Sequence, residues 1–182
     1  MVKTSSSAAR GSSKKQEILD ESVGLLRRSS LTSWSIDGCA TAAHCAKGLV
    51  IHYFRGRDPL LQASAAALIT QRIDRYRLAL KDGGVAALDR LWDVLRTAAT
   101  DGSARAILEL RLAGVSSASI SASDAAALIG ALARSLEVEA RELPLASALE
   151  SILDGYLLAL LGGADPEGVK EAYFRYWISF VP

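Results

Sequence analysis

The chain has 182 residues, of which 50% are apolar and 23% charged, and only four are proline. This composition excludes an intrinsically disordered chain, and the two cysteines exclude a disulfide-rich scaffold. The net charge of +1 conceals an asymmetry, because residues 1–60 carry nine Lys or Arg against five Asp or Glu, whereas residues 61–182 carry twelve against fifteen. A basic front part is typical of a segment that binds phosphate groups.

Fold class and compartment follow from the same composition. Ala, Leu, Arg and Glu are abundant and β-branched runs are scarce, which favours an all-α fold of about nine helices. No apolar run approaches the roughly 20 residues that cross a bilayer, and no basic segment followed by an apolar one directs secretion. We therefore expect a soluble protein in a reducing cytoplasm.

The first elements are a tail and a helix. Residues 1–13 are rich in serine and lack periodic apolar positions, so they predict a disordered tail, either a frayed terminus or an electrostatic arm on DNA. From Lys14 to Arg28 apolar residues recur on one helical face, which predicts a helix, and Ser13 is available as its N-cap.

Two short helices around a tight turn are predicted next. Ser35 is a candidate N-cap for a helix that ends at Ala43, and a second helix spans 46–54. His44 and Cys45 form the turn between them.

The remaining chain predicts longer amphipathic helices. Arg55 and Gly56 suit a helix end, and Asp58 with Pro59 then begins a helix that runs to about Lys81. Further helices are expected at about 85–99, 103–113, 122–141, 145–161 and 165–180, the last with Asp165 as N-cap and Pro166 as its first residue.

The helix pair has the properties of a helix-turn-helix unit. Ala40 supplies the small residue needed where the two helices cross, and Cys39 and Cys45 can fill the small core as apolar side chains. Small residues at the start of the second helix would let its backbone approach the floor of the major groove. The candidate DNA-facing residues of this helix are Lys47, Gly48, Leu49, Ile51 and His52.

The segment from about Ile18 to Leu61 resembles the DNA-binding domain of the TetR family of bacterial transcriptional regulators. The family spacing is retained without a gap by CA at 39–40, AHCA at 43–46, KG at 47–48, IHYF at 51–54 and GRDPLL at 56–61. Two positions depart from the family pattern: His44 replaces the usual turn glycine, and Ile51 replaces a common tyrosine. The resemblance therefore implies a left-handed backbone conformation at His44, which histidine tolerates better than bulky residues do.

The resemblance implies a role for individual residues. Residues 47–49 correspond to positions that approach base edges, and Tyr53 to an aromatic residue or histidine that touches phosphate. Arg57 corresponds to the family's phosphate-binding lysine, a role that suits the planar fork of a guanidinium at a helix start. Ser35 corresponds to a Thr or Ser that caps the second helix and often contacts phosphate.

The resemblance also implies an organisation and a function. The helix-turn-helix DNA-binding domain would span 14–60, and a helical effector-binding and dimerisation domain 61–182. Such a protein is expected to bind palindromic double-stranded operator DNA as a homodimer, as a repressor that a small-molecule effector releases, within the bacterial cytoplasm or on its nucleoid. His44 and Ile51 leave an alternative open: a helical ligand-binding or interaction protein whose head has lost DNA binding.

The last two predicted helices carry six of the eleven aromatic residues, more than one buried stripe needs, and so suggest a partner. The resemblance implies that this partner is a second copy, because family members dimerise through a four-helix bundle built from these helices. The alternative is an intramolecular core. The interface candidates are Leu149, Ile152, Leu153, Tyr156, Tyr173, Tyr176, Trp177 and Phe180.

The family keeps its effector pocket among the middle helices. Residues able to line such a pocket are Trp92, Arg96, Arg105, Glu109, Arg111 and Tyr156, although a residue of each of these types is more often an ordinary surface or core side chain. The chemical identity of an effector is not evident from these side chains.

Other chemistries find little support in the sequence. Cys39, His44, Cys45 and His52 match no zinc-ligand spacing, so we expect no metal. The chain has only two histidines and shows neither a glycine-rich phosphate loop nor a nucleophile elbow. We therefore expect no cofactor and no enzymatic activity.

Overall fold

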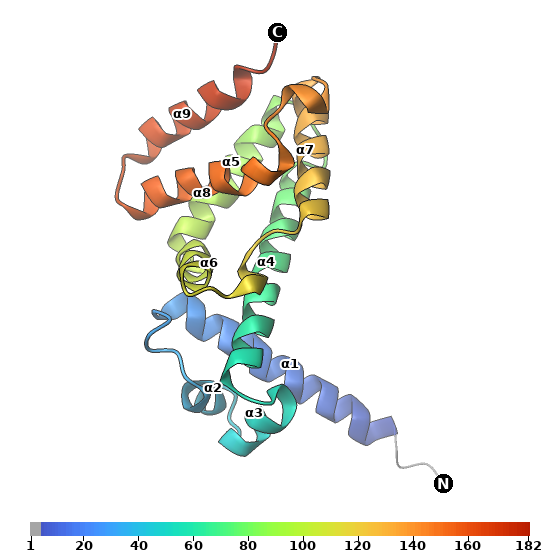
Figure 1. The fold of residues 1–182 in the computed structure, drawn as a ribbon, viewed down its shortest axis with the longest axis vertical. Coiled ribbons are helices and arrows are strands. Elements are labelled where there is room, and N and C mark those ends of the chain that lie inside the picture. The colour runs from blue at the N-terminus through green and yellow to red at the C-terminus, as the bar shows by residue number, and fades with distance from the viewer. Residues whose placement is uncertain (1–4) are drawn as a thin grey trace. The chain divides into compact units, whose positions relative to one another are not determined.

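The structure is a computed structural model that describes the backbone of residues 5–182 and the side chains of residues 13–182. Over this range it contains nine α-helices, two short 3₁₀ segments and no strand, so the predicted all-α fold is confirmed (Figure 1). The helices are α1 Ser5–Arg28, α2 Ile36–Ala42, α3 Lys47–Phe54, α4 Arg57–Ala79, α5 Val85–Thr100, α6 Ser103–Leu112, α7 Ala122–Leu136, α8 Ala146–Leu161 and α9 Pro166–Ile178, with 3₁₀ segments η1 Ser116–Ala118 and η2 Ala140–Glu142.

Helix α1 begins earlier than the sequence predicts. It starts at Ser5, so helix replaces the disordered tail expected over 1–13, of which residues 1–4 lie outside the described part of the chain. Ser13 is consequently an interior residue of the helix and not its N-cap. The physical reason is cooperativity, because lengthening a helix already anchored by buried residues such as Ile18 is far less costly than starting a new one.

Two helix starts coincide with the side-chain caps that the sequence predicts. Ser35 Oγ accepts a hydrogen bond from Gly38 N at 3.0 Å at the start of α2. Asp165 Oδ2 accepts one from Gly168 N at 2.9 Å at the start of α9, where Pro166 is the first helical residue. Each cap satisfies a backbone donor that has no partner within the helix.

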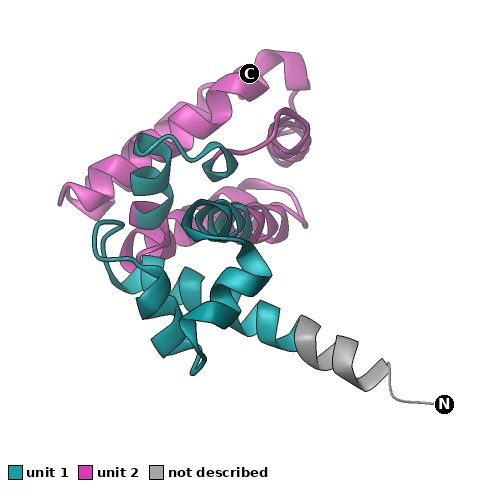
Figure 2. Cartoon of the chain, turned by 60° about the horizontal axis from the view of Figure 1, so that its bottom comes forward, with its two compact units in different colours: residues 1–68, 106–118 teal, residues 69–105, 119–182 magenta. Residues whose placement is uncertain are grey.

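The chain divides into two compact units (Figure 2). Unit 1 comprises the residues up to Leu68 together with 106–118, and unit 2 comprises 69–105 and 119–182. The sequence-based division, in contrast, assigns the whole of 61–182 to one domain. The late segment of unit 1 is held by hydrogen bonds, since Glu109 Oε2 accepts from Leu31 N at 2.7 Å and Gln62 Oε1 accepts from Ser117 N at 3.1 Å.

Unit 1 has an apolar core around a small polar cluster. Ser22 Oγ lies 2.7 Å from Ser64 Oγ and accepts a hydrogen bond from Trp34 Nε1 at 3.1 Å. All three side chains are buried, so these bonds satisfy groups that cannot reach water. The apolar side chains of this unit that are at most 1% exposed include Ile18, Leu26, Cys39, Val50 and Leu60.

Unit 2 has a core of leucine and aromatic side chains with one buried ion pair. Tyr173 packs against Trp92 and Trp177, and its hydroxyl donates to Leu88 O at 3.1 Å. Arg72 Nη2 lies 2.6 Å from Asp154 Oδ1, although both side chains are almost fully buried. Among the described residues, none of the helices combines the length and the apolar character that a bilayer crossing requires.

Candidate nucleic-acid interface

The turn between α2 and α3 is tight and contains a left-handed residue. Cys45 N donates to Ala40 O at 2.9 Å, and His44 has a φ angle of 47°, as expected from its replacement of a glycine. The side chain of His44 is exposed, so it does not obstruct the crossing of the two helices. Histidine is therefore compatible with the helix-turn-helix geometry at this position.

Substitutions of His44 test the strain of this turn. We expect His44→Val to lower the free energy of unfolding by about 1–2 kcal/mol, because a β-branched residue is strongly disfavoured at positive φ. His44→Gly should not lower it by a comparable amount, since glycine adopts this conformation without steric cost. Urea denaturation followed by circular dichroism measures both. Equal stability of the two variants would contradict the strain.

Helix α2 and the residue that follows it pack one side against the interior of unit 1. Cys39, Ala40 and Ala43 are buried, and Lys14 Nζ donates to Ala43 O at 2.7 Å, where the carbonyl groups at the end of α2 need partners. Burial raises the pKa of the Cys39 thiol above its usual value, so this residue acts as a small apolar side chain. Cys45 is only half-buried.

Helix α3 has a buried face and an exposed face. Val50 and Phe54 are buried, whereas Lys47, Gly48, Ile51 and His52 are exposed, and Leu49 and Tyr53 are half-buried. A side chain built at Gly48 would meet no atom within 4 Å, so packing inside the protein does not require glycine there. The exposed face of α3 thus contains most of the predicted DNA-facing residues, and Gly48 places no side chain on it near the start of the helix.

Arg57 is the first residue of α4 and is held over an aromatic ring. Its guanidinium lies 5.4 Å from the centroid of the Trp34 ring, and its Nη1 atom is 3.5 Å from Asp58 Oδ1. The side chain nevertheless remains 52% exposed. A cation–π contact of this kind restrains the side chain while leaving donors for a phosphate.

A shallow hollow lies beside Tyr53 and contains a cation that the sequence reasoning did not single out. Lys15 Nζ lies 5.5 Å from the centroid of the Phe54 ring. The hollow measures about 500 Å³ and is lined by Lys15, Gln16, Leu19, Tyr53, Phe54, Pro59 and Ala63. No motif marks Lys15, because its position beside α3 depends on the packing of α1 against that helix.

The predicted effector-pocket residues are divided between the two compact units. Glu109 and Arg111 belong to unit 1, where Glu109 accepts from Leu31 N and Arg111 Nη2 donates to Ala118 O at 3.0 Å. The other four, Trp92, Arg96, Arg105 and Tyr156, belong to unit 2. Unit 2 also contains a buried hydrogen-bonded group of Arg72, Tyr76 and Asp154, which the sequence reasoning missed because Asp154 lies 82 positions from Arg72.

The predicted dimer residues divide into core and surface. Leu149, Leu153, Tyr173 and Trp177 are at most 1% exposed, so they belong to the core of unit 2. Helices α8 and α9 bury them against α5 and α7. Ile152, Tyr156, Tyr176 and Phe180 remain half-buried.

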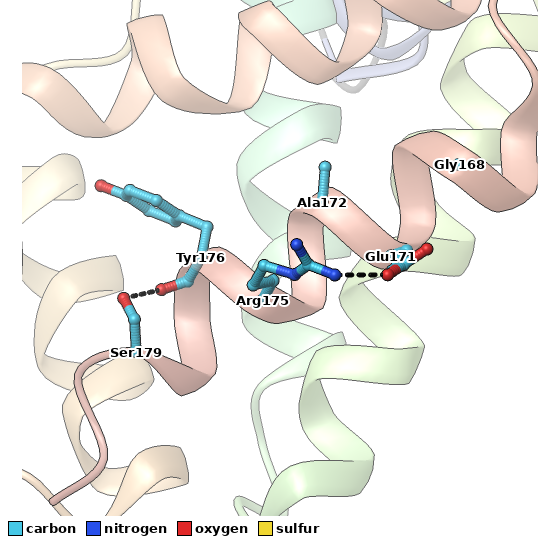
Figure 3. A pocket seen from close by; sticks show the side chains of 6 residues that line it. All are labelled: Gly168, Glu171, Ala172, Arg175, Tyr176 and Ser179. Carbon is cyan, nitrogen blue, oxygen red and sulfur yellow. Dashed lines mark hydrogen bonds and ion pairs between the residues drawn. The ribbon is translucent and has the colours of Figure 1, made fainter.

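Two adjoining hollows lie on the surface of α8 and α9. One of about 630 Å³ is lined mostly by small residues, namely Ser151, Ile152, Gly155, Tyr156, Ala159, Ala164, Asp165, Gly168, Val169 and Ala172. The other, of about 540 Å³, runs along α9 (Figure 3) and is lined by Gly168, Glu171, Ala172, Arg175, Tyr176 and Ser179. Ala172 borders both hollows, and small residues leave room there for a neighbouring helix.

Several solved structures are similar to this chain in overall fold. A TetR-family member from Streptomyces coelicolor A3 aligns with a TM-score of 0.65 and 22% identity over 93% of this chain and 98% of its own. The multidrug binding protein EbrR, complexed with imidazole, aligns with a TM-score of 0.64 and 24% identity over 93% and 90%.

The TetR-family repressor AlkX from Dietzia sp. strain DQ12-45-1b, implicated in biodegradation of n-alkanes, aligns with a TM-score of 0.58 and 20% identity over 92% and 97%. No family model and no curated protein matches the sequence. The similarity therefore extends over almost the whole length of each chain, and this protein has the fold of the TetR-family transcriptional regulators.

Proposed function

We propose that the chain is a TetR-type transcriptional regulator that binds palindromic operator DNA as a homodimer and acts as a repressor released by a small-molecule effector. The observation that carries this proposal is the helix-turn-helix of unit 1, whose tight turn leaves the outer face of α3 exposed beside Arg57. No catalytic step is part of this function.

The DNA-binding part would be residues 14–60. In a helix-turn-helix unit the second helix enters the major groove with its first residues near the base edges. Residues 47–49 begin α3 and would take this role, with Ile51, His52 and Tyr53 further along the helix. Ser35 and Arg57 flank the helix pair at the starts of α2 and α4, where they would contact the phosphate backbone.

The homodimer is supported by the surface of α8 and α9. The larger of its two hollows is lined mostly by small residues, and half-buried aromatic side chains line or adjoin both hollows. Two heads related by a two-fold axis would match a palindromic site. The interface residues of this proposal are Ile152, Tyr156, Ala172, Tyr176 and Phe180.

The effector would bind in unit 2, the larger helical part of the chain. Its effect on DNA affinity must equal its difference in affinity for the DNA-bound and DNA-free conformations.

Selection of binding sites from random duplex DNA tests the proposed function. The full chain should enrich a palindromic consensus, and binding of that site should be followed by fluorescence anisotropy. The variant Lys47→Ala should shift the preferred bases, because a residue at a base edge contributes to discrimination. Failure of the wild-type chain to enrich any site would refute DNA recognition by this protein.

Arg57→Ala tests the phosphate contact separately from base recognition. We expect it to weaken binding to the enriched site and to a scrambled duplex alike. It should also lower the slope of log K against log salt concentration by about one unit, since one phosphate contact is lost. Anisotropy titrations at several salt concentrations measure both quantities. An unchanged slope would show that Arg57 does not neutralise a phosphate.

A further inference from the structure

Helix α3 contains a single Lys or Arg, and a carboxylate of the preceding helix engages it. Lys47 Nζ lies 2.9 Å from Asp37 Oδ2, and the two side chains are 54% and 68% exposed. Asp37 is the only charged residue of α2, and Lys47 is the only lysine or arginine of α3. The surface formed by these two helices therefore carries no net charge from lysine, arginine and carboxylate groups.

The other basic side chains of this region lie outside the helix pair. Lys15 belongs to α1, Arg55 follows α3, and Arg57 begins α4, and all three are exposed. Lysine and arginine residues that neutralise phosphates supply nearly all of the affinity for random DNA. Attraction to the backbone thus comes from the flanks, while the centre of the helix pair, next to the proposed base contacts, is neutral.

The ion pair changes what Lys47 can do without removing its hydrogen-bonding capacity. A lysine ammonium has three N–H donors, and Asp37 occupies one of them. The others remain available for acceptors such as guanine O6 and N7. A phosphate, in contrast, gains little from Lys47, because the adjacent carboxylate cancels its charge and repels an anion.

The position of Asp37 does not by itself explain the contact. An acid in the first turn of α2 is favourable at the positive end of a helix dipole, and this would hold with the side chain pointing in any direction. An ion pair this exposed also contributes little to folding. Attraction between opposite charges directs the carboxylate toward the one lysine of α3, and the consequence of this contact is a change in the charge that α3 presents to DNA.

We propose that Asp37 is a specificity-determining residue: by neutralising and orienting Lys47, it weakens binding to random DNA more than binding to the operator. This inference rests on the proposed DNA-binding function and adds a residue outside α3 to it. Discrimination then arises partly from suppressing the wrong complex, in addition to stabilising the right one.

The test compares Asp37→Asn with the wild type on two duplexes, the site enriched from random DNA and a scrambled duplex of the same composition. On the scrambled duplex we expect about fivefold to tenfold tighter binding and a salt slope larger by about one unit, because Lys47 can then neutralise a phosphate. On the enriched site the affinity should change by less than about twofold, since the base contacts persist.

Two controls separate this mechanism from a general change in charge. Asp20→Asn removes the same charge from exposed α1, where the carboxylate accepts from Gln16 Nε2 at 2.9 Å, and it should alter both duplexes equally and slightly. In a Lys47→Gln background, Asp37→Asn should behave like Asp20→Asn. Urea denaturation of Asp37→Asn confirms that the variant is folded.

Each outcome distinguishes the inference from the function on which it rests. Unequal tightening, confined to the scrambled duplex and dependent on Lys47, supports the role of Asp37. Equal tightening on both duplexes, or no change on either, overturns that role and leaves the DNA-binding function intact. If the wild-type chain enriches no site at all, both the function and the inference are refuted.

Discussion

Asp154→Ala is expected to lower the free energy of unfolding by about 3–5 kcal/mol, which is among the largest effects of any single substitution in this chain. Arg72 and Asp154 are 5% and 7% exposed, and their Nη2 and Oδ1 atoms lie 2.6 Å apart. Removing the carboxylate leaves a buried guanidinium without its counter-ion. Although burial favours the neutral form, the neighbouring Tyr76 and Asp154 raise the pKa of Arg72 above its usual value, so the guanidinium is charged in the folded protein.

A double variant separates the loss of a partner from the net contribution of the pair. Arg72→Met combined with Asp154→Leu should be far closer to wild type than Asp154→Ala, because apolar residues of similar volume often replace a buried ion pair at little cost. Asp89→Ala serves as the exposed control, since Asp89 Oδ1 lies 3.5 Å from Lys170 Nζ at the surface. That variant should lose less than about 1 kcal/mol.

Urea denaturation followed by tyrosine and tryptophan fluorescence measures all three stabilities. A loss below about 1 kcal/mol in Asp154→Ala would show that water reaches Arg72 in the folded protein. A double variant as unstable as the single one would show that the pair itself, and not the unpaired charge, accounts for the effect.

Local signals in the sequence were sufficient for the starts of α2 and α9. Ser35 and Asp165 each cap a helix with a side-chain oxygen that accepts a hydrogen bond from the backbone N–H three residues later. Both partners therefore lie within one short segment of the sequence. His44 was identified in the same way, by its place in a motif that requires a left-handed residue. The start of α1 was missed because helix lengthening depends on the packing of the whole helix and not on the residues at its end.

The polar groups of the interior could not be predicted in this way. Arg72 and Asp154 are separated by 82 positions. The sequence around each of them does not distinguish it from an exposed charged residue of the same helix. The contact between Glu109 and Leu31 spans 78 positions. Such pairs are determined by the packing of helices on one another, whereas the amphipathic pattern of a single helix reports only that one face is buried.

The same limitation applies to the aromatic residues near the end of the chain. Their number suggests a surface for a partner, yet Tyr173 and Trp177 are fully buried within the subunit. Helical periodicity shows that a stripe is apolar without showing which element covers it. The small residues beside them, such as Gly155 and Ala172, mark the exposed part of α8 and α9 more directly.

Ala172→Arg is expected to convert the proposed homodimer into a monomer. Ala172 is exposed within the subunit and borders both hollows on α8 and α9, so its replacement should leave the fold of the subunit intact (Figure 3). In a dimer formed through this surface, the new guanidinium would be buried against the partner without a counter-ion. Such a charge costs about 3–5 kcal/mol, which corresponds to a dissociation constant raised by roughly two to four orders of magnitude.

The control for this substitution is Ala127→Arg, which places the same side chain at an exposed position of α7, away from the two hollows. Size-exclusion chromatography with light scattering should show a dimer for the wild type and for Ala127→Arg, and a monomer for Ala172→Arg. Circular dichroism should show unchanged helix content in all three. If Ala172→Arg stays dimeric at the concentrations at which the wild type does, the surface of α8 and α9 is not the interface.

The monomeric variant also tests the link between assembly and DNA recognition. Because a palindromic site is bound by two heads that are joined through the dimer, a monomer binds each half-site separately and loses the gain from linkage. Ala172→Arg should therefore bind the enriched palindrome no more tightly than an isolated half-site, while keeping the same base preference. A variant that is monomeric yet retains full affinity for the palindrome would show that each head recognises DNA independently of dimerisation.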